Sequence, residues 1–331
     1  MSEKKKLLAV VAGSRMGNTE ILAKEALMAA AKYDHVEVEL LRLPDLDLHP
    51  CIACRPCTQI KNGTCIWKDD GEWVENKIKD CDALLVCASC YSLTPPAGLT
   101  ILRDRVMGPR LDAACTDEVA SNPDMGQGGM FEGVPMLKDP RLRKKRVAGI
   151  ITVGGAIEPD WTSLIVPICQ TCVFPAGMKL IDIHASHGCA DQGSVLVKPG
   201  VMEGCRRVGE HMAEALKDVE NAHWMGGEQG VCPICHNDVY KLHPEDGTAE
   251  CAVCGIRGPM SVVDGKFVID YPAESLAVSR YYDAGRAKHG KEVAMVAKAF
   301  APYREQVKEM LPKYREYKDC ILVPPSRQKK G

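Results

Sequence analysis

The sequence predicts an α/β fold built on a five-stranded parallel sheet, and two observations support this prediction. Short apolar runs alternate with amphipathic stretches between residues 7 and 217, which is the rhythm of βαβ units. The chain has 331 residues, 46% of them hydrophobic and 26% charged, which is enough apolar material for one large core. A doubly wound domain followed by a smaller module therefore fits the length and the pattern.

Each strand of the sheet is predicted from one apolar run. The strand candidates are residues 7–12, 36–41, 83–88, 147–153 and 178–184, and the helix candidates between them are 19–31, 96–106, 160–172 and 202–217. Five parallel strands with these crossovers fit a flavodoxin-like order, 2-1-3-4-5. In such a sheet we expect ligands to bind at the carboxyl ends of the strands, at the switch point between the first and third.

Composition divides the rest of the chain. Residues 111–140 are rich in glycine and proline without periodicity, and we interpret them as a long insertion loop. The stretch HWMGGEQG, residues 223–230, separates the sheet domain from a new cysteine pattern. The predicted domains are thus 1–222 for the sheet domain, 223–270 for a small metal module and 271–331 for a helical extension.

Charge and cysteine usage limit the class of protein. The formal net charge of −2 and the pI near 6.5 argue against a general nucleic-acid binder. We find no apolar run of the roughly 18 residues that a spanning helix needs, so we expect no membrane segment and a cytoplasmic location. In that reducing compartment the 17 cysteines favour metal binding over disulfides.

The loop after the first strand is a candidate phosphate site. It leads into a helix that begins near residue 18, and backbone N–H groups at a helix N-terminus can hold a phosphate. An ordinary capped turn uses the same groups. The loop matches neither the GxGxxG fingerprint nor Walker A, so a ligand with one phosphate, such as FMN, fits better than a dinucleotide. The candidate phosphate contacts are Ser14, Arg15, Asn18 and Thr19.

Two further loops are predicted on the same rim. The loop after the third strand offers an aromatic ring face and small polar groups to an isoalloxazine, although a proline-terminated turn has the same composition. The loop after the fourth strand lacks side chains and permits a close backbone approach. The candidate residues are Ser89, Cys90, Tyr91 and Ser92 in the first of these loops and Gly154 and Gly155 in the second.

A compact cysteine group follows the second strand. The four residues Cys51, Cys54, Cys57 and Cys65 have the spacing Cys-x2-Cys-x2-Cys-x7-Cys. Three thiolates on consecutive short steps suit a 4Fe-4S cluster better than one tetrahedral ion. A zinc knot or free core cysteines are the alternatives. The position on the predicted flavin rim permits electron transfer between cluster and flavin.

A second cysteine group lies in the small module. Cys232, Cys235, Cys251 and Cys254 form CxxC-x15-CxxC, which is typical of a tetrahedral four-thiolate site and is similar to zinc ribbons and rubredoxins. Zinc there is structural, whereas iron is a one-electron relay. Both metals accept four sulfur ligands, so the ligand set leaves zinc and iron open.

Three motifs together resemble the iron-sulfur flavoproteins of the NADPH-dependent FMN reductase-like, flavodoxin-fold superfamily. The motifs are GSRMGNTEILAKEAL, CIACRPC followed by KDD, and CDALLVCASCYSLTPP, and the resemblance covers residues 5–217. It implies FMN phosphate on the first loop, the isoalloxazine against the third, and a 4Fe-4S cluster on the compact cysteines. Cys90 stands where that family often has proline, and the first loop is shorter than usual.

These observations predict an FMN-dependent oxidoreductase that passes electrons between FMN and a 4Fe-4S cluster. NAD(P)H or a ferredoxin-like protein is the expected donor, and the resemblance implies a homo-oligomer. One alternative is an FMN-dependent reductase of a specific small organic substrate, with residues 111–140 as the lid of its pocket. Another is a non-catalytic redox sensor or interaction protein.

Overall fold

Five parallel strands form the centre of the protein. The structure is a computed structural model and describes residues 4–14, 16–54, 57, 65–121, 139–227, 230, 232–322 and 324. The sheet has the order β2-β1-β3-β4-β5. The fold class and strand order predicted from the sequence are confirmed, and the strands differ from the predicted ranges by a few residues at their ends. They are β1 (Lys5–Ala12), β2 (Val36–Arg42), β3 (Ala83–Ser89), β4 (Val147–Val153) and β5 (Lys179–Ser186).

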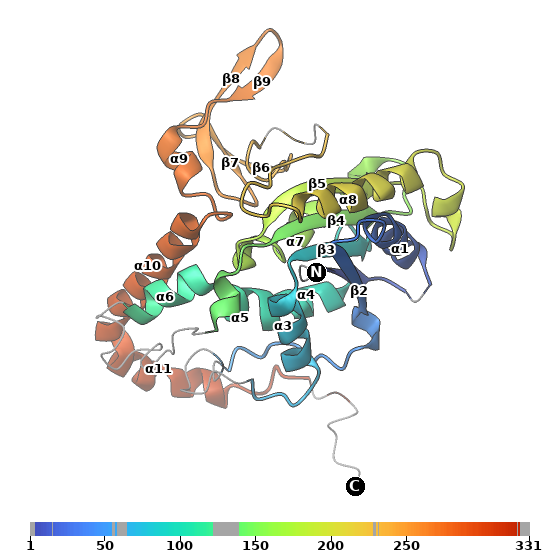
Figure 1. Cartoon of the computed structure of the whole chain (residues 1–331). Coiled ribbons are helices and arrows are strands. Elements are labelled where there is room, and N and C mark those ends of the chain that lie inside the picture. Colours follow the sequence, from blue (N-terminus) through green and yellow to red (C-terminus); the bar gives the residue numbers. More distant parts are fainter. Residues whose placement is uncertain are drawn as a thin grey trace.

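Helices cover both faces of this sheet (Figure 1). Alternate residues of a strand point to opposite faces, so Leu8 and Val10 of β1 join one buried cluster while Leu7 and Ala9 join another. The first cluster is covered by α3 (Gly71–Asp80), α4 (Ala97–Leu102) and α7 (Ile165–Gln170). The second is covered by α1 (Asn18–Ala30) and α8 (Val201–Ala215). Burial on both faces explains why the strands are continuous apolar runs.

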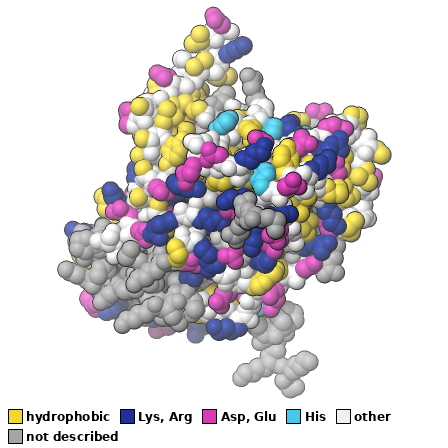
Figure 2. All heavy atoms as spheres, viewed as in Figure 1, with side chains coloured by type: hydrophobic (Ala, Val, Ile, Leu, Met, Phe, Trp, Pro, Cys, Tyr) yellow, Lys and Arg dark blue, Asp and Glu magenta, His cyan; other side chains and the backbone are white. Residues whose placement is uncertain are grey.

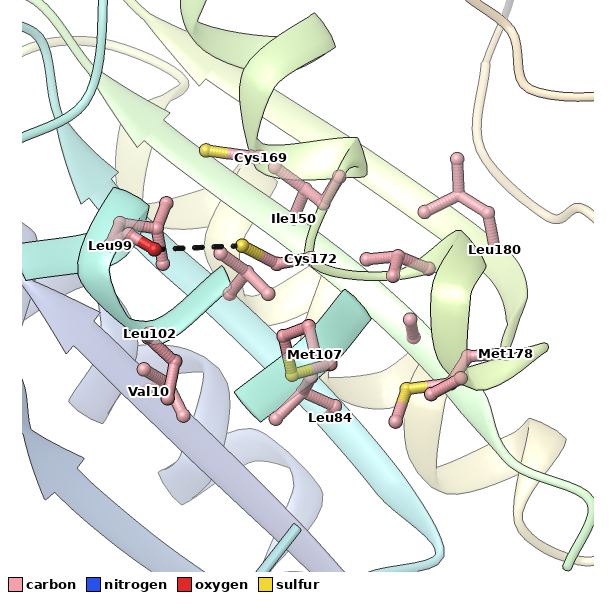
Figure 3. Close-up of a cluster of buried hydrophobic side chains, with 14 of the residues drawn as sticks. Val10, Leu84, Leu99, Leu102, Met107, Ile150, Cys169, Cys172, Met178 and Leu180 are labelled. Carbon is pink, nitrogen blue, oxygen red and sulfur yellow. Dashed lines mark hydrogen bonds between the residues drawn. The ribbon is translucent and has the colours of Figure 1, made fainter. Parts of the chain in front are cut away.

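The helical segments after β3 and β4 are more irregular than the sequence pattern predicts. The predicted helix 96–106 is α4 followed by a π-helical stretch, Arg103–Met107, and by α5 (Gly108–Leu111). The predicted helix 160–172 is reduced to α7, because Pro159–Thr162 forms a separate 3-10 turn. Cys169 and Cys172 lie in the core beside Leu99, whose carbonyl oxygen accepts from the Cys172 thiol at 3.9 Å (Figure 3).

The interpretation of residues 111–140 as a loop is wrong for its first part. Residues 113–121 form α6 (Ala113–Ser121), and the Asp112 carboxylate accepts a hydrogen bond of 3.0 Å from the backbone N–H of Cys115. Asp112 is therefore an N-terminal cap of α6. The sequence of this helix has no apolar periodicity, so the pattern did not predict it. Residues 122–138, which hold all four glycines of the predicted loop, lie outside the described part of the chain.

The remainder of the chain forms the metal module and a helical tail. The module is an antiparallel sheet of β6 (Tyr240–His243), β7 (Thr248–Cys251), β8 (Arg257–Val263) and β9 (Lys266–Ile269). The tail contains α9 (Ala273–Ala277), α10 (Asp283–Phe300) and α11 (Arg304–Glu316), and α6 packs along α10 (Figure 1). The domain limits at 222/223 and 270/271 stay predictions. None of the helices in the described ranges is long and apolar enough to cross a membrane.

Basic and acidic side chains are interleaved on the surface (Figure 2). The basic run at residues 141–146 illustrates this arrangement. Arg141 pairs with Asp80 at 2.7 Å and with Asp139 at 2.6 Å. Arg146 is buried and donates to the carbonyl oxygens of Lys79 at 2.6 Å and Cys81 at 3.2 Å. Arg141 and Arg146 therefore already have partners within the protein.

Glu20 gives the first testable prediction. Its buried carboxylate accepts from Arg42 Nη2 at 2.7 Å and from the Met16 N–H at 2.8 Å, and the guanidinium of Arg42 holds the pKa of Glu20 well below its ordinary 4.5. The ionised group therefore stabilises the fold above about pH 4.5, and this stabilisation is lost as the pH falls further.

We expect Glu20→Gln to lower the free energy of unfolding by about 2 kcal/mol at pH 7, because hydrogen bonds to charged groups contribute this much. The difference from the unsubstituted protein should shrink below pH 4.5. Urea unfolding from pH 3 to 8 measures it. Glu214→Gln, at an exposed position on α8, is the control, and a pH-independent effect of Glu20→Gln would contradict the prediction.

Candidate functional site

The loop after β1 ends in an uncapped helix N-terminus. Gly17 is the N-cap of α1 and no side chain of the described residues caps it, which leaves the N–H groups of Asn18 and Thr19 directed to the loop. Thr19 is buried. A Cβ added at Gly13 would lie only 2.6 Å from the Thr19 hydroxyl oxygen, so the loop packs closely against this side chain. The two free backbone N–H groups can hold an anion, so phosphate binding by this loop stays a prediction.

The side chain of Asn18 joins the start of α1 to the loop after β5. Its Nδ2 donates to the carbonyl oxygens of Cys189 at 2.9 Å and Asp191 at 2.8 Å, and its Oδ1 accepts from the Gly193 N–H at 2.7 Å. These bonds tie the loop after β5 to the start of α1, so phosphate contact by Asn18 would use its backbone N–H. Ser14 is exposed on the loop, and Arg15 lies outside the described residues.

The loop after β3 forms a tight turn on the same rim. Ser89 Oγ donates to the Ala12 carbonyl oxygen at 3.2 Å, which joins this loop to the end of β1. Tyr91 and Thr94 exchange two backbone hydrogen bonds around Ser92 and Leu93, whose φ angles of 47° and 74° are left-handed. Such a turn reverses the chain in two residues and leaves the Tyr91 ring 56% exposed at the rim.

The loop after β4 completes the rim. Gly154 bonds through its N–H to the Ser186 carbonyl oxygen at 2.8 Å, and an added Cβ would collide with the Thr162 methyl group. The Cys90 thiol donates to the Trp161 carbonyl oxygen at 3.4 Å, which brings the β3 and β4 loops together. Trp161 is 63% exposed. The three predicted loops therefore meet at one edge of the sheet.

Two residues at this edge, Trp161 and His187, lie outside the set of predicted cofactor contacts. Trp161 is a second exposed aromatic residue, on the loop that the Cys90 thiol joins to the loop after β3. His187, after β5, places its Nδ1 3.1 Å from Thr162 Oγ1, and burial lowers the pKa of the imidazole. In the sequence, Trp161 follows the Gly154-Gly155 pair by a few residues, and this was the only indication that it belongs to the site. The folded loop shows that Trp161 meets the loop after β3.

This edge fits FMN. The uncapped N-terminus of α1 suits a single phosphate. Gly154 packs against the Thr162 methyl group and Gly155 against Ala190, so the two glycines let the loop after β4 fold closely at this edge. Tyr91 offers a ring face for stacking. Which of the ten predicted residues contacts FMN stays a prediction.

The compact cysteine group is not assembled like a cluster site among the described residues. Cys51 and Cys54 are exposed, whereas Cys57 and Cys65 are half-buried and line a cavity of about 440 Å³ together with Arg105. Burial raises the pKa of the Cys57 thiol, and the nearby Arg110 opposes this shift. Most of the residues between Cys54 and Cys65 lie outside the described part. The 4Fe-4S cluster therefore stays a prediction.

A buried ion pair supports this cysteine loop. Arg105 donates from Nη1 and Nη2 to the two oxygens of Asp69, each at 2.8 Å, and also to the His49 carbonyl oxygen at 2.6 Å. The guanidinium holds the pKa of Asp69 well below its usual range. Because His49 precedes the first cysteine and Asp69 follows the last, the pair closes the loop at its base.

The second cysteine group converges on one point. The Sγ atoms of Cys232, Cys235, Cys251 and Cys254 all lie within 4.8 Å of one another, and three of the pairs are 3.4 Å apart. An ion with Zn–S bonds of about 2.3 Å places its four sulfurs about 3.8 Å apart, so the group has the dimensions of a tetrahedral site. All four residues are buried.

The two knuckles of this site have matching backbones. The residue after each CxxC has a left-handed φ, 55° at His236 and 77° at Gly255. Each donates its N–H to the carbonyl oxygen of the first cysteine of its knuckle, at 3.0 Å. The geometry fits zinc and iron equally.

A further cavity of about 700 Å³ lies between α6, α10 and the core. Apolar side chains such as Val119, Phe174 and Val293 line it, together with Asp112 and His289. Burial raises the pKa of Asp112 to about 6. The described part of residues 111–140 thus borders a cavity of ligand size, while its role as a lid stays a prediction.

Comparison with known proteins supports the FMN site. Residues 6–120 match the family described as NADPH-dependent FMN reductase. A flavone synthase from Aspergillus candidus is 28% identical over 332 residues, which cover 97% of this chain and 99% of the relative. A solved structure of a flavone reductase is 26% identical, with a TM-score of 0.76, and covers 96% of this chain and 99% of that chain.

A shorter match concerns the iron-sulfur prediction. An iron-sulfur flavoprotein from Methanocaldococcus jannaschii is 36% identical over 89 residues, which are 27% of this chain and 45% of the relative. Taken together, the matches show an FMN-dependent oxidoreductase with the coarse function of a reductase. The non-catalytic alternative considered from the sequence is therefore wrong.

The second cysteine group gives a prediction on metal content. We expect the purified protein to hold one zinc or iron ion per chain at this group, and Cys254→Ser to lose it, because three thiolates of a buried four-thiolate site bind far less tightly. Elemental analysis with a Co²⁺-substitution spectrum measures both. Cys320→Ser, at an exposed cysteine of the tail, is the control, and unchanged metal content in Cys254→Ser would contradict the assignment.

Proposed function

We propose that the protein is an FMN-dependent reductase of a planar aromatic carbonyl compound of the flavone class, with NAD(P)H as the electron donor. The observation that carries the proposal is the extent of the two similarities. Both the flavone synthase and the flavone reductase match more than nine-tenths of the chain, including the ranges of the metal module and the tail. A flavone has a carbon–carbon double bond conjugated to a carbonyl, which is a suitable hydride acceptor.

The aromatic residues at the sheet edge support this substrate class. Tyr91 and Trp161 are exposed on adjacent loops, which the Cys90–Trp161 hydrogen bond holds together. Aromatic rings prefer offset or edge-to-face contact with other rings, so the pair offers two surfaces to a flat substrate. Small polar substrates would gain little from such a site.

The chemistry requires a hydride and a proton. Bound FMN would supply hydride transfer between NAD(P)H and the substrate. The protein orients the substrate, and His187 is placed to move the proton. Thr162 donates its hydroxyl proton to the Pro159 carbonyl oxygen at 2.8 Å, so it accepts from His187 Nδ1–H. That tautomer leaves His187 Nε2 unprotonated, so Nε2 would first take up a proton from water and then pass it to the substrate.

Trp161→Ala tests the substrate site. We expect KM for flavone to rise about 10-fold, because loss of an aromatic pair costs about 0.5–1.5 kcal/mol beyond the buried area. Reduction of bound FMN by NAD(P)H should stay unchanged. Steady-state kinetics under nitrogen, with the product identified by mass spectrometry, measure the first quantity, and single-turnover absorbance measures the second.

Trp73→Ala is the matched control for this variant. Trp73 is 51% exposed on α3, away from the three loops, and contacts Lys77. An equal rise of KM in both variants would show a general surface effect and would count against the site. Absence of flavone turnover in the unsubstituted protein would sink the proposed substrate class.

A second candidate function is electron relay through a 4Fe-4S cluster to a ferredoxin-like carrier. The observation that favours it is the shared position of Cys57 and Cys65 in one cavity beside Arg105 and Arg110, which are suited to balance the negative charge of a thiolate-ligated cluster. The 89-residue similarity to an iron-sulfur flavoprotein also supports it. The predicted homo-oligomer and the cytoplasmic location belong to the same proposal.

Anaerobic reconstitution tests this relay. We expect about four iron and four sulfide per chain beyond the metal of the module, since a cubane holds four of each. Cys57→Ser should lower the iron and sulfide content and leave the metal of the module in place, whereas Cys320→Ser should change neither. Protein that stays free of sulfide after reconstitution would rule out the cluster.

A further inference from the structure

Helix α7 lies against the metal module at its C-terminal end. Gln170, its last residue, is fully buried, and its Nε2 donates to the Cys235 carbonyl oxygen at 2.5 Å. Cys235 is one of the four convergent cysteines. The Oε1 atom of Gln170 has no hydrogen-bond partner among the residues that the structure describes. The hydrogen bond from Gln170 to the Cys235 carbonyl oxygen therefore offsets part of the free-energy cost of burying this polar side chain.

The chain that leads into α7 forms the flavin edge. The loop 154–164 begins at Gly154, which packs against Thr162, and its Trp161 carbonyl oxygen accepts from the Cys90 thiol. Leu164 is the N-cap of α7 and accepts from the Ile168 N–H at 3.0 Å. The rim loop and the metal knuckle are therefore joined by a single helix of six residues.

The middle of α7 is held in the core. Cys169 and Ile165 are buried, and Cys172 just beyond the helix lies beside Leu99 of α4 (Figure 3). A helix this short is unstable alone, so packing and end contacts fix its position. Of the end contacts, the Gln170–Cys235 bond depends on the shape of the knuckle, and that shape depends on a bound ion.

We propose that the metal-loaded knuckle holds α7, and through it the loop 154–164, in the position that binds FMN. Gln170 is the positioning residue of this link. The inference goes beyond the proposed function, and it requires only that FMN binds at the carboxyl edge of the sheet. The metal of the module then has a role in the flavin site whether it is zinc or iron.

Gln170→Ala tests the link in the full-length, metal-loaded protein. We expect the Kd for FMN to rise about 10-fold, a loss of about 1.4 kcal/mol, while the metal content stays at one ion per chain in the module. FMN fluorescence quenching measures the affinity and elemental analysis measures the metal. Limited proteolysis should show faster cleavage within the loop 154–164.

Thr171→Val is the matched control, because Thr171 Oγ1 donates only within the helix end, to the Ile168 carbonyl oxygen at 2.6 Å. Its FMN affinity should stay within about 2-fold of the unsubstituted protein, as exposed or local changes cost little. A rise equal to that of Gln170→Ala would show general damage to α7 and would overturn the proposal.

Removal of the metal is a second test of the link between the module and the FMN site. A chelator should weaken FMN binding by the unsubstituted protein, and should weaken it little further in Gln170→Ala, because both changes break the same link. Fully additive effects, or an unchanged Kd in Gln170→Ala, would overturn the proposal. These readouts use FMN alone, so they do not depend on whether flavone is the substrate.

Discussion

The parallel register between neighbouring strands is the constraint on which the site depends. Ala12 of β1 pairs with Ala88 of β3, and Ser89 of β3 pairs with Val153 of β4. Val153 in turn pairs with Ser186 of β5. Because these strands end at the same level, every loop that follows them leaves the sheet at one edge. Short bonds such as Ser89 to Ala12 and Gly154 to Ser186 then join the loops to each other.

The sequence predicted which loops meet at this edge, but it did not predict the contacts of the side chains on these loops. Continuous apolar runs identify strands buried on both faces, so five strands and their order follow from periodicity and crossover handedness. The direction of Asn18 does not follow, because its partners are carbonyl oxygens more than 170 residues away in the chain. Trp161 entered the site only with the fold, because the Cys90 thiol that its carbonyl oxygen meets is 71 residues away in the chain. Helix α6 was missed because a capping Asp112, rather than an apolar stripe, starts it.

The two cysteine groups show what spacing can and cannot establish. In CxxC-x15-CxxC the two knuckles impose their own geometry, and the structure brings all four sulfurs together. In the compact group the geometry depends on how a long loop folds, and the described residues leave Cys51 and Cys54 exposed. The spacing therefore predicted the site of the metal module, where the local backbone of each knuckle positions two of the ligands.

We propose that FMN at this edge reduces a flavone-type substrate, and single-turnover absorbance is the most direct measurement of that reaction. The protein is reduced by NAD(P)H without oxygen and then mixed with flavone. We expect the flavin absorbance to return in one saturable phase, with one reduced product formed per FMN. Flavin that stays bleached with flavone, yet reoxidises at once with a one-electron acceptor, would show that flavone is not the substrate.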